Sequence, residues 1–275
     1  MRTAGVAGEN PTKAGLLLDF LNIVCYKWGS RYTAEDVNIL RASVARHLSI
    51  PHRFFCVTDD GAGLLPDIEV RPLPRQAMIG NGPKISTFSD GFLDLDRESY
   101  VVSLDVDIVV VGNLDFLGAD PEKTFVIARH RSKRSISRGH GAVYRVKVGS
   151  HRKIWDEFID DPQGWSEKFP GLNSGNRFSE QRWLEYQFAG REMDFFEDNK
   201  VLIFRKDCSA RAASSFLGWT LGQLGLTTAF LGEASLPGVG ESIVSFSGGT
   251  KPKDVMHRHH GHLRRAPFVK EHWHL

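Results

Sequence analysis

The sequence is poor in cysteine and has no long apolar run. Its 275 residues include three cysteines, Cys25, Cys56 and Cys208, which are far apart and odd in number. They form no Cys-x-x-Cys metal pair and indicate no disulfide framework, so each is predicted to be a small buried side chain in a reducing, cytoplasmic setting. No segment reaches the roughly 18 apolar residues of a transmembrane helix. Glu9 and Asn10 stand where a signal peptide would have its apolar core, so we expect no secretory leader.

Net charge is also nearly absent. The 35 lysines and arginines almost balance the 33 aspartates and glutamates, which leaves a formal net charge of +2. A generic nucleic-acid binder usually has a strong basic excess, so we expect no nucleic-acid partner. Hydrophobic and charged contents of 41% and 25% are ordinary for a soluble globular protein. The length is sufficient for one large domain or two small ones.

An apolar run from residue 101 to residue 111 is broken near its middle by Asp105 and Asp107. Such a run is typical of a buried strand, where ionised carboxylates are normally paired or bound to metal. Residues i and i+2 of an extended chain point to the same face, so both carboxylates can offer oxygen ligands to one Mn²⁺ or Mg²⁺ ion. The alternative is a polar turn with both carboxylates solvated. The apolar flanks on both sides favour the metal site.

The order of apolar patterns predicts an α/β protein with a mixed, mostly parallel central sheet flanked by helices. Strands are expected at 16–25, 53–57, 68–73, 100–104, 124–128, 141–148, 201–204 and 242–246, with 68–73 at an edge, 108–111 leaving the strand 100–104, and 141–148 half exposed. Thr33 and Asp36 predict the capped start of a helix with one apolar stripe. Shorter helices are expected at 84–88, at 154–159 and from Ser179 onward.

Three regions are expected along the chain. Residues 1–15 are small and polar and predict a poorly ordered arm, 16–255 form the main domain, and 256–275 form a basic, histidine-rich tail. The tail holds six of the 11 histidines, which can bind metal, although a solvated tail is the simpler prediction. The segment 209–236 is rich in glycine and small residues, and both a helix and an extended loop stay open for it.

Two loops have the composition of ligand-binding segments. Tyr26 and Trp28 follow the first strand and can stack a nucleobase, while Lys27 or Arg31 can meet a phosphate. Residues 247–252 form a small-residue loop whose N–H groups and Lys251 can cradle a phosphate. A surface loop packed on the next helix and a plain turn are the respective alternatives. The basic run 129–138 is either a solvated loop or a surface for an anionic partner.

Taken in order, four segments resemble the GT-A glycosyltransferases, nearest to the family-8-like bacterial enzymes. The most specific match is the Asp-x-Asp block at 103–114. The segments 24–29 with 37–40, 56–60 and 245–252 are similar to the first strand and nucleotide loop, the acidic turn, and the late His-x-x-Gly-x-x-Lys-Pro motif of the family. The resemblance extends from about residue 18 to the end, with 209–236 unmatched. It implies a single GT-A, Rossmann-like domain.

The resemblance also implies a function. The chain would move a sugar, as a hexosyltransferase, from a nucleotide-diphosphate donor such as a UDP-sugar to an unknown saccharide, lipid or protein acceptor, with retention of configuration. Peripheral contact with the inner face of a membrane stays open. The implied site residues are the metal ligands Asp105 and Asp107, the groups Glu180 and Gln181 near the reacting sugar, and the donor-binding residues Tyr26, Lys27, Trp28, Asp59, Asp60, Lys84, Ser103, Leu104, Gly248 and Lys251.

Two positions depart from the family pattern. Ser245 stands where the family has a metal-binding histidine, so the cation would have fewer protein ligands, or Asp254 or a tail histidine would replace it. His140 stands where the family usually has asparagine, so the identity of the sugar cannot be carried over.

Two other functions fit parts of the pattern. A haloacid-dehalogenase-like phosphatase also places Asp-x-Asp after an apolar strand, with the first aspartate as nucleophile. Its motif normally lies near the start of the domain, whereas here about one hundred residues precede it. A catalytically impaired sugar-nucleotide-binding protein is the second alternative, because of Ser245.

Overall fold

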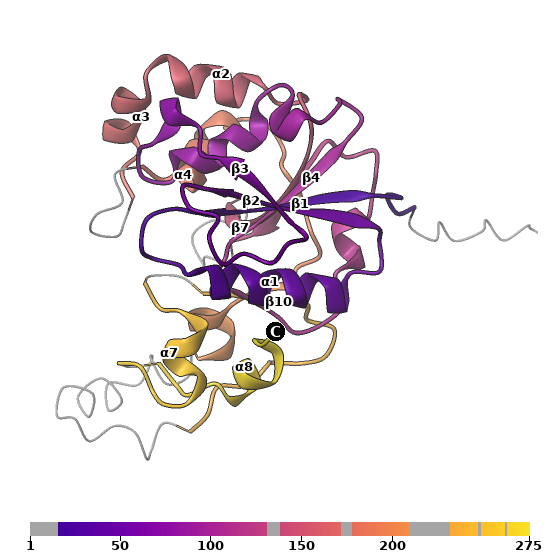
Figure 1. Ribbon diagram of the computed structural model, residues 1–275, viewed down its shortest axis with the longest axis vertical. Helices are drawn as coiled ribbons and strands as arrows, with labels where there is room; N and C mark the ends of the chain where they lie inside the picture. The colour runs from indigo at the N-terminus through magenta and orange to yellow at the C-terminus, as the bar shows by residue number, and fades with distance from the viewer. Residues whose placement is uncertain (1–15, 131–137, 172–177, 210–231, 247–248, 262) are drawn as a thin grey trace, which may run out of the picture.

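The central feature of the computed structural model is one twisted sheet with helices on both sides (Figure 1). The structure describes residues 16–130, 138–171, 178–209, 232–246, 249–261 and 263–275. The prediction for the arm at 1–15 lies outside these residues, as does most of the unassigned segment 209–236. None of the helices in the described ranges is long and apolar enough to cross a membrane.

Within the described residues, seven strands form the central sheet in the order β3-β2-β1-β4-β7-β6-β8. Their bounds are Leu21–Lys27 (β1), His52–Thr58 (β2), Ile68–Pro72 (β3), Tyr100–Leu104 (β4), Phe125–Arg129 (β6), Gly139–Lys147 (β7) and Asp194–Phe195 (β8). Strands β1 to β4 pair in parallel, and β7 is antiparallel to both β4 and β6. The predicted mixed, mostly parallel α/β sheet is confirmed, with β3 at its edge.

A second, three-stranded sheet joins the middle of the chain to its later part. It consists of Ile108–Val110 (β5), Ile243–Ser245 (β10) and Val201–Ile203 (β9), with β10 in the centre. Ser245 of β10 pairs with Ile108 of β5, and the Phe246 N–H donates to the Asp107 carbonyl at 3.2 Å. The segment directly after the two aspartates is therefore held by a strand much later in the sequence.

Helices cover both faces of the central sheet. In Figure 1, Ala34–His47 (α1) lies beneath the sheet, and Lys153–Asp160 (α2), Pro162–Lys168 (α3) and Glu180–Gln187 (α4) lie above it. Side chains alternate along β1 as a strand requires: Ile23 and Cys25 join the core with α1, and Val24 and Tyr26 join the core with α2 and α4. The predicted capping box of Thr33 and Asp36 opens α1.

Short 3₁₀ and π elements connect these layers. They are Arg75–Ala77 (η1), Gly82–Phe88 (η2), Phe92–Asp94 (η3), Asp115–Gly118 (η4) and the π-helical Phe204–Cys208 (η5). The predicted helix at 84–88 is thus part of a 3₁₀ segment with all seven residues buried. The burial of η2 fixes the side chain of Lys84 against the sheet.

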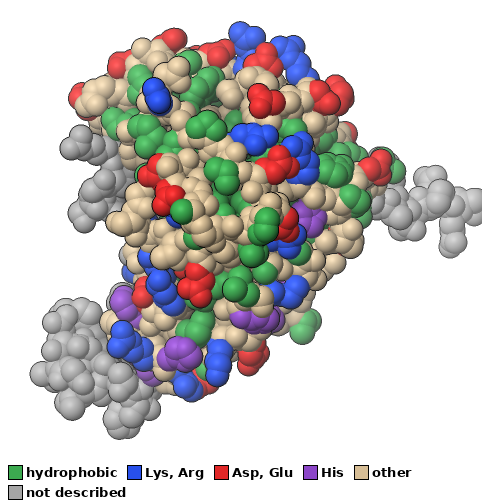
Figure 2. All heavy atoms as spheres, viewed as in Figure 1, with side chains coloured by type: hydrophobic (Ala, Val, Ile, Leu, Met, Phe, Trp, Pro, Cys, Tyr) green, Lys and Arg blue, Asp and Glu red, His purple; other side chains and the backbone are tan. Residues whose placement is uncertain are grey.

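The end of the chain packs more closely than a solvated tail would. Pro252–Met256 (α7) and Pro267–His272 (α8) form a third core with β5, β9 and β10, to which Leu263, Phe268 and Val269 contribute. Lys, Arg and His side chains remain on the outside, where they gather on the lower part of the face in Figure 2. Apolar residues interspersed among the histidines therefore dock this segment.

Strand β7 differs from the predicted half-exposed strand. All but its last residue are buried, including Arg145, whose side chain is fully buried. The Arg145 guanidinium donates to the carbonyl oxygens of Leu117 at 2.9 Å and Asp120 at 2.8 Å, and lies over the Tyr100 ring. The apolar and basic alternation was misleading because this cation is satisfied by backbone carbonyls rather than by water.

Candidate functional site

Lys84 lies at the centre of a buried ion cluster at the carboxyl edge of the sheet. Its Nζ atom is 2.7 Å from Asp105 Oδ1 and 3.2 Å from Glu180 Oε1, and it donates to the Gly141 carbonyl at 2.9 Å. Three elements bring these groups together: η2 carries Lys84, β4 leads into Asp105, and α4 begins with Glu180. The Lys84 and Glu180 side chains are 5% and 10% exposed, whereas that of Asp105 is 32% exposed. Asp105 is therefore the member of this cluster most open to a ligand.

Neighbouring residues fix the geometry of this ion cluster. Asn81 Nδ2 donates to Glu180 Oε2 at 2.7 Å. A Cβ atom at Gly141 would lie 2.8 Å from Glu180 Oε1, so a larger residue there would displace the carboxylate. The Tyr144 hydroxyl donates to the Lys84 carbonyl at 3.2 Å. Asn81 and Tyr144 had no signal in the sequence, because nothing in the spacing of residues indicates which distant side chains meet.

The second aspartate, Asp107, is held by the loop after β1. The Tyr32 hydroxyl donates to Asp107 Oδ2 at 2.5 Å, and Arg31 Nη2 lies 3.6 Å from the same oxygen. The Asp107 side chain is 5% exposed. Tyr32 was missed as a site residue, although its place in the aromatic loop was a signal that could have identified it.

The pKa values of Asp105 and Asp107 reflect burial and the mutual repulsion of the two carboxylates. Burial and the charge of Asp105 raise the pKa of Asp107 to about 7, against the hydrogen bond from Tyr32. Burial also raises the pKa of Asp105, although Lys84 opposes the shift. Burial disfavours the charged form of Lys84, but Asp105 and Glu180 outweigh it and raise its pKa above the usual range. Lys84 and Asn81 in turn hold the pKa of Glu180 below its usual value.

The Asp105–Asp107 pair fits a hard divalent cation. Raised carboxylate pKa values mean that the site favours additional positive charge, and carboxylate oxygens are preferred ligands of Mn²⁺ and Mg²⁺. The Ser245 hydroxyl oxygen is buried and has no hydrogen-bond partner among the residues that the structure describes, and its strand pairs with the segment after Asp107. No group of three or more His, Cys, Asp or Glu ligands is present among the described residues, so diphosphate or water oxygens would complete the coordination.

The predicted nucleotide loop lies at the same edge of the sheet, because β1, β2 and β4 are parallel. Asp59 Oδ2 accepts the Gly29 N–H at 2.9 Å, and this bond lowers the pKa of Asp59. Lys27 is buried and donates to the Asp60 carbonyl at 2.9 Å. Trp28 is partly buried against the core above the sheet. Lys27, Asp59 and Asp60 thus fix the two loops to each other.

Tyr26 lies beneath the site rather than on its surface. Its side chain is buried, and its hydroxyl bonds with Ser86 Oγ at 3.1 Å and Thr87 Oγ1 at 2.8 Å. Ser103 and Leu104 of β4 are buried as well. These residues support η2 and the start of the aspartate segment from below.

The late loop contacts the loop after β1 that holds Asp107. Lys251 Nζ donates to the Arg31 carbonyl and lies over the Tyr32 ring, 5.2 Å from its centroid. Gly248 lies outside the described residues. Lys251 is thereby brought to the loop that contacts Asp107, as the resemblance implied for two parts of one site.

Gln181 and His140 flank the ion cluster. Gln181 is half-buried on α4, and its Nε2 is 3.5 Å from Glu185 Oε1. His140 is buried on β7, with its ring stacked on that of His130 at 5.7 Å between centroids. Burial lowers the pKa of His140 to about 3, so its imidazole is neutral. The departure at His140 therefore places an uncharged aromatic ring beside Gly141 and the cluster.

Comparison with known proteins identifies the fold. No protein-family model and no curated protein sequence matches the chain. Two solved structures of the glycosyltransferase GlyE from Streptococcus pneumoniae TIGR4 are similar. The apo form has a TM-score of 0.50 and 16% identity over 84% of this chain, and the second structure has a TM-score of 0.51 and 15% identity over 84%. The chain has a glycosyltransferase fold. It spans about half of those proteins, 55% and 56% of their lengths.

Proposed function

We propose that the chain is a metal-dependent glycosyltransferase that uses a nucleotide-diphosphate sugar. The observation that carries this proposal is the pair Asp105 and Asp107, at the carboxyl ends of the parallel strands β1, β2 and β4, beside the buried Lys84–Glu180 ion pair. Ligands of open α/β sheets bind at this edge. The glycosyltransferase fold supports the same function. UDP as the nucleotide, a hexose as the sugar and retention of configuration rest on the family resemblance.

The proposed metal would be held by Asp105 and Asp107. When bound, Mn²⁺ or Mg²⁺ would supply Lewis-acid stabilisation for a leaving diphosphate. Lys251, which lies beside Tyr32 and Arg31, would add a positive charge near Asp107. Preorganised charges of this kind stabilise the leaving group without reorganisation during the reaction.

Glu180 and Gln181 are the groups proposed to face the reacting sugar. Transfer of a glycosyl group develops positive charge at the anomeric carbon, which a carboxylate or carboxamide stabilises. Lys84 and Asn81 keep Glu180 ionised and fix its orientation. Lys84 itself is a positioning group for both Asp105 and Glu180, because it contacts one oxygen of each.

The test is a thermal-shift screen of UDP-sugars with Mn²⁺ on the full chain. A ligand at about one hundred times its Kd stabilises the folded state by about 2.7 kcal/mol, which raises Tm by several degrees. We expect such a shift for the wild type and for Asp90→Asn, an exposed carboxylate paired with Arg97. We expect none for Asp105→Asn. Normal donor binding by Asp105→Asn would remove the metal assignment.

A second candidate function follows from Ser245. Because Ser245 replaces a histidine ligand, Asp105 and Asp107 are the two metal ligands proposed among the described residues. The second candidate is therefore a protein that binds a sugar nucleotide without turnover. Donor binding without hydrolysis or transfer to any acceptor of a panel would support that function. Release of phosphate from phosphate esters without nucleotide binding would instead support the phosphatase and reject both proposals.

A further inference from the structure

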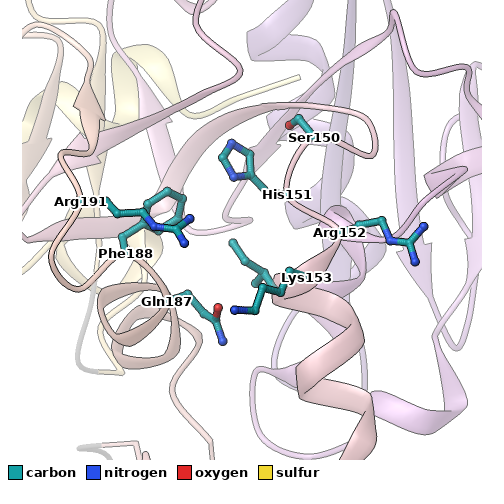
Figure 3. A pocket seen from close by; sticks show the side chains of 8 residues that line it. Ser150, His151, Arg152, Lys153, Gln187, Phe188 and Arg191 are labelled. Carbon is teal, nitrogen blue, oxygen red and sulfur yellow. The ribbon is translucent and has the colours of Figure 1, made fainter.

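A polar cavity lies between the start of α2 and the end of α4, and none of its lining residues belongs to the ion cluster. Its volume is about 170 Å³, far above the roughly 15 Å³ that one water requires. Figure 3 shows the side chains of His151, Lys153, Gln187 and Arg191 around a common space, whereas Arg152 points away from it. Three basic side chains from two separate segments therefore converge on one cavity.

The charges around the cavity leave Arg191 uncompensated. Within the described part of the chain, its backbone N–H donates to the Phe188 carbonyl at 3.0 Å, but its guanidinium forms no ion pair and no hydrogen bond. Lys153 is paired with Glu157 at 3.2 Å, and Gln187 donates to the same carboxylate at 2.6 Å. The Lys153 side chain is 69% exposed, and exposed pairs of this kind contribute about 0–1 kcal/mol. Lys153 can therefore turn toward an anion at little cost.

His151 supplies a third donor. Its Nε2 is 3.2 Å from Thr124 Oγ1, and its ring packs against the stacked pair Phe125 and Phe188, with centroid distances of 5.7 and 5.5 Å. The remaining ring nitrogen, Nδ1, has no hydrogen-bond partner in the ranges that the structure describes. Burial and the charge of Arg191 lower the pKa of His151, so an anion in the cavity would reverse part of this shift.

We propose that this cavity binds a phosphate group, with Arg191, Lys153 and His151 as donors, at a site separate from that of the sugar donor. A planar guanidinium, an ammonium and an imidazole approaching from different sides match the several oxygens of one phosphate. The group belongs either to free phosphate or to a phosphorylated sugar.

A neighbouring cavity could hold the sugar ring if the ligand is a phosphorylated sugar rather than free phosphate. It has a volume of about 220 Å³ and shares His151, Phe188 and Arg191 with the first. Thr124, Glu192 and Asp194 line its other side, where hydroxyl and carboxylate oxygens can accept hydrogen bonds from sugar hydroxyls. A sugar phosphate would place its phosphate at Arg191 and its ring in this second cavity.

The experiment is an NMR titration of the full chain, labelled at histidine, with inorganic phosphate and with glucose 1-phosphate. We expect saturable shifts of the His151 imidazole and a rise of its pKa on binding. Arg191→Gln should weaken binding about tenfold, the effect of losing a charge-assisted hydrogen bond. The matched control is Arg75→Gln, which removes the same charge from an exposed arginine outside both cavities, and should leave the affinity within about twofold.

Three results would overturn the proposal. They are an unshifted His151 signal while other residues respond, chemical shifts that do not saturate, and an equal weakening of binding by Arg191→Gln and Arg75→Gln. Tighter binding of glucose 1-phosphate than of phosphate supports the site and assigns it to a sugar phosphate, and equal affinities support it and assign it to free phosphate. The outcome is independent of the proposed transferase function, because no residue of the ion cluster takes part.

Discussion

Replacing Lys84 with methionine removes the cation on which the buried cluster depends. Methionine has a similar length, so the main change is the loss of an ammonium with acceptors at 2.7, 2.9 and 3.2 Å. At an effective dielectric constant of about 20, each of the two ion pairs has a gross Coulomb energy of about 5–6 kcal/mol. Desolvation of the charges offsets much of this energy. We expect a net loss of about 3–5 kcal/mol in the free energy of unfolding, as for other broken buried pairs.

The loss should depend on pH in a defined direction. Without Lys84, the pKa of Glu180 in the folded state rises above that of the unfolded chain, and the pKa of Asp105, which is already raised, rises further. The folded state then binds more protons, so the variant recovers stability as the pH falls. Urea unfolding of Lys84→Met at pH 8 and pH 5 measures this change, with the wild type at both pH values as reference.

A second variant separates the two carboxylates. Lys84→Met combined with Glu180→Gln leaves only Asp105, whose side chain is 32% exposed and can be hydrated. The double variant should therefore be more stable than Lys84→Met alone, with a coupling energy of at least about 1 kcal/mol. The reasoning is refuted if Lys84→Met loses less than about 1 kcal/mol, or if its loss is the same at both pH values.

Two further variants test buried groups on β7. His140→Asn should make the protein less sensitive to acid. Because the pKa of His140 is about 3 in the folded state and about 6.5 in the unfolded chain, the wild type loses up to about 1.4 kcal/mol of stability per pH unit as the pH falls below 6.5. Urea unfolding from pH 7 to pH 4 should therefore give a flatter stability profile for the variant. An unchanged profile would mean that His140 is hydrated. Arg145→Met should cost about 3 kcal/mol or more, because it leaves several buried carbonyl oxygens without a donor. The control for Arg145→Met is Lys147→Met on the same strand, β7, which removes a cation paired with exposed Glu98 and should cost less than about 1 kcal/mol.

Local patterns in the sequence predicted most elements of the fold. The apolar run before Asp105 gave β4 with its observed bounds, and Thr33 with Asp36 gave the start of α1. These signals are local, since strand periodicity and helix capping involve residues a few positions apart. The pairing of β10 with β5 and β9 had no such signal, because periodicity does not indicate which strands become neighbours.

The site was predictable in its residues rather than in its contacts. Asp105, Lys84 and Glu180 were each predicted as candidates from the sequence, but their contact in one ion cluster was not, because 96 positions separate Lys84 from Glu180. Tyr26 illustrates the reverse case. Its aromatic ring suggested a surface for a nucleobase, whereas the alternation of side chains along β1 points the ring toward the core. Distances and orientations of this kind depend on the packing of the whole chain.

The order of contacts around Asp107 has a consequence for the time at which the site forms during synthesis. Strands β1, β2 and β4 lie in the first part of the chain, and domains fold as their residues become available. Ser245 pairs with Ile108, and Lys251 contacts the loop of Arg31, 220 positions earlier. The central sheet can therefore assemble while the chain is still being made, but the contacts around Asp107 are completed only after β10 and Lys251 have been synthesised.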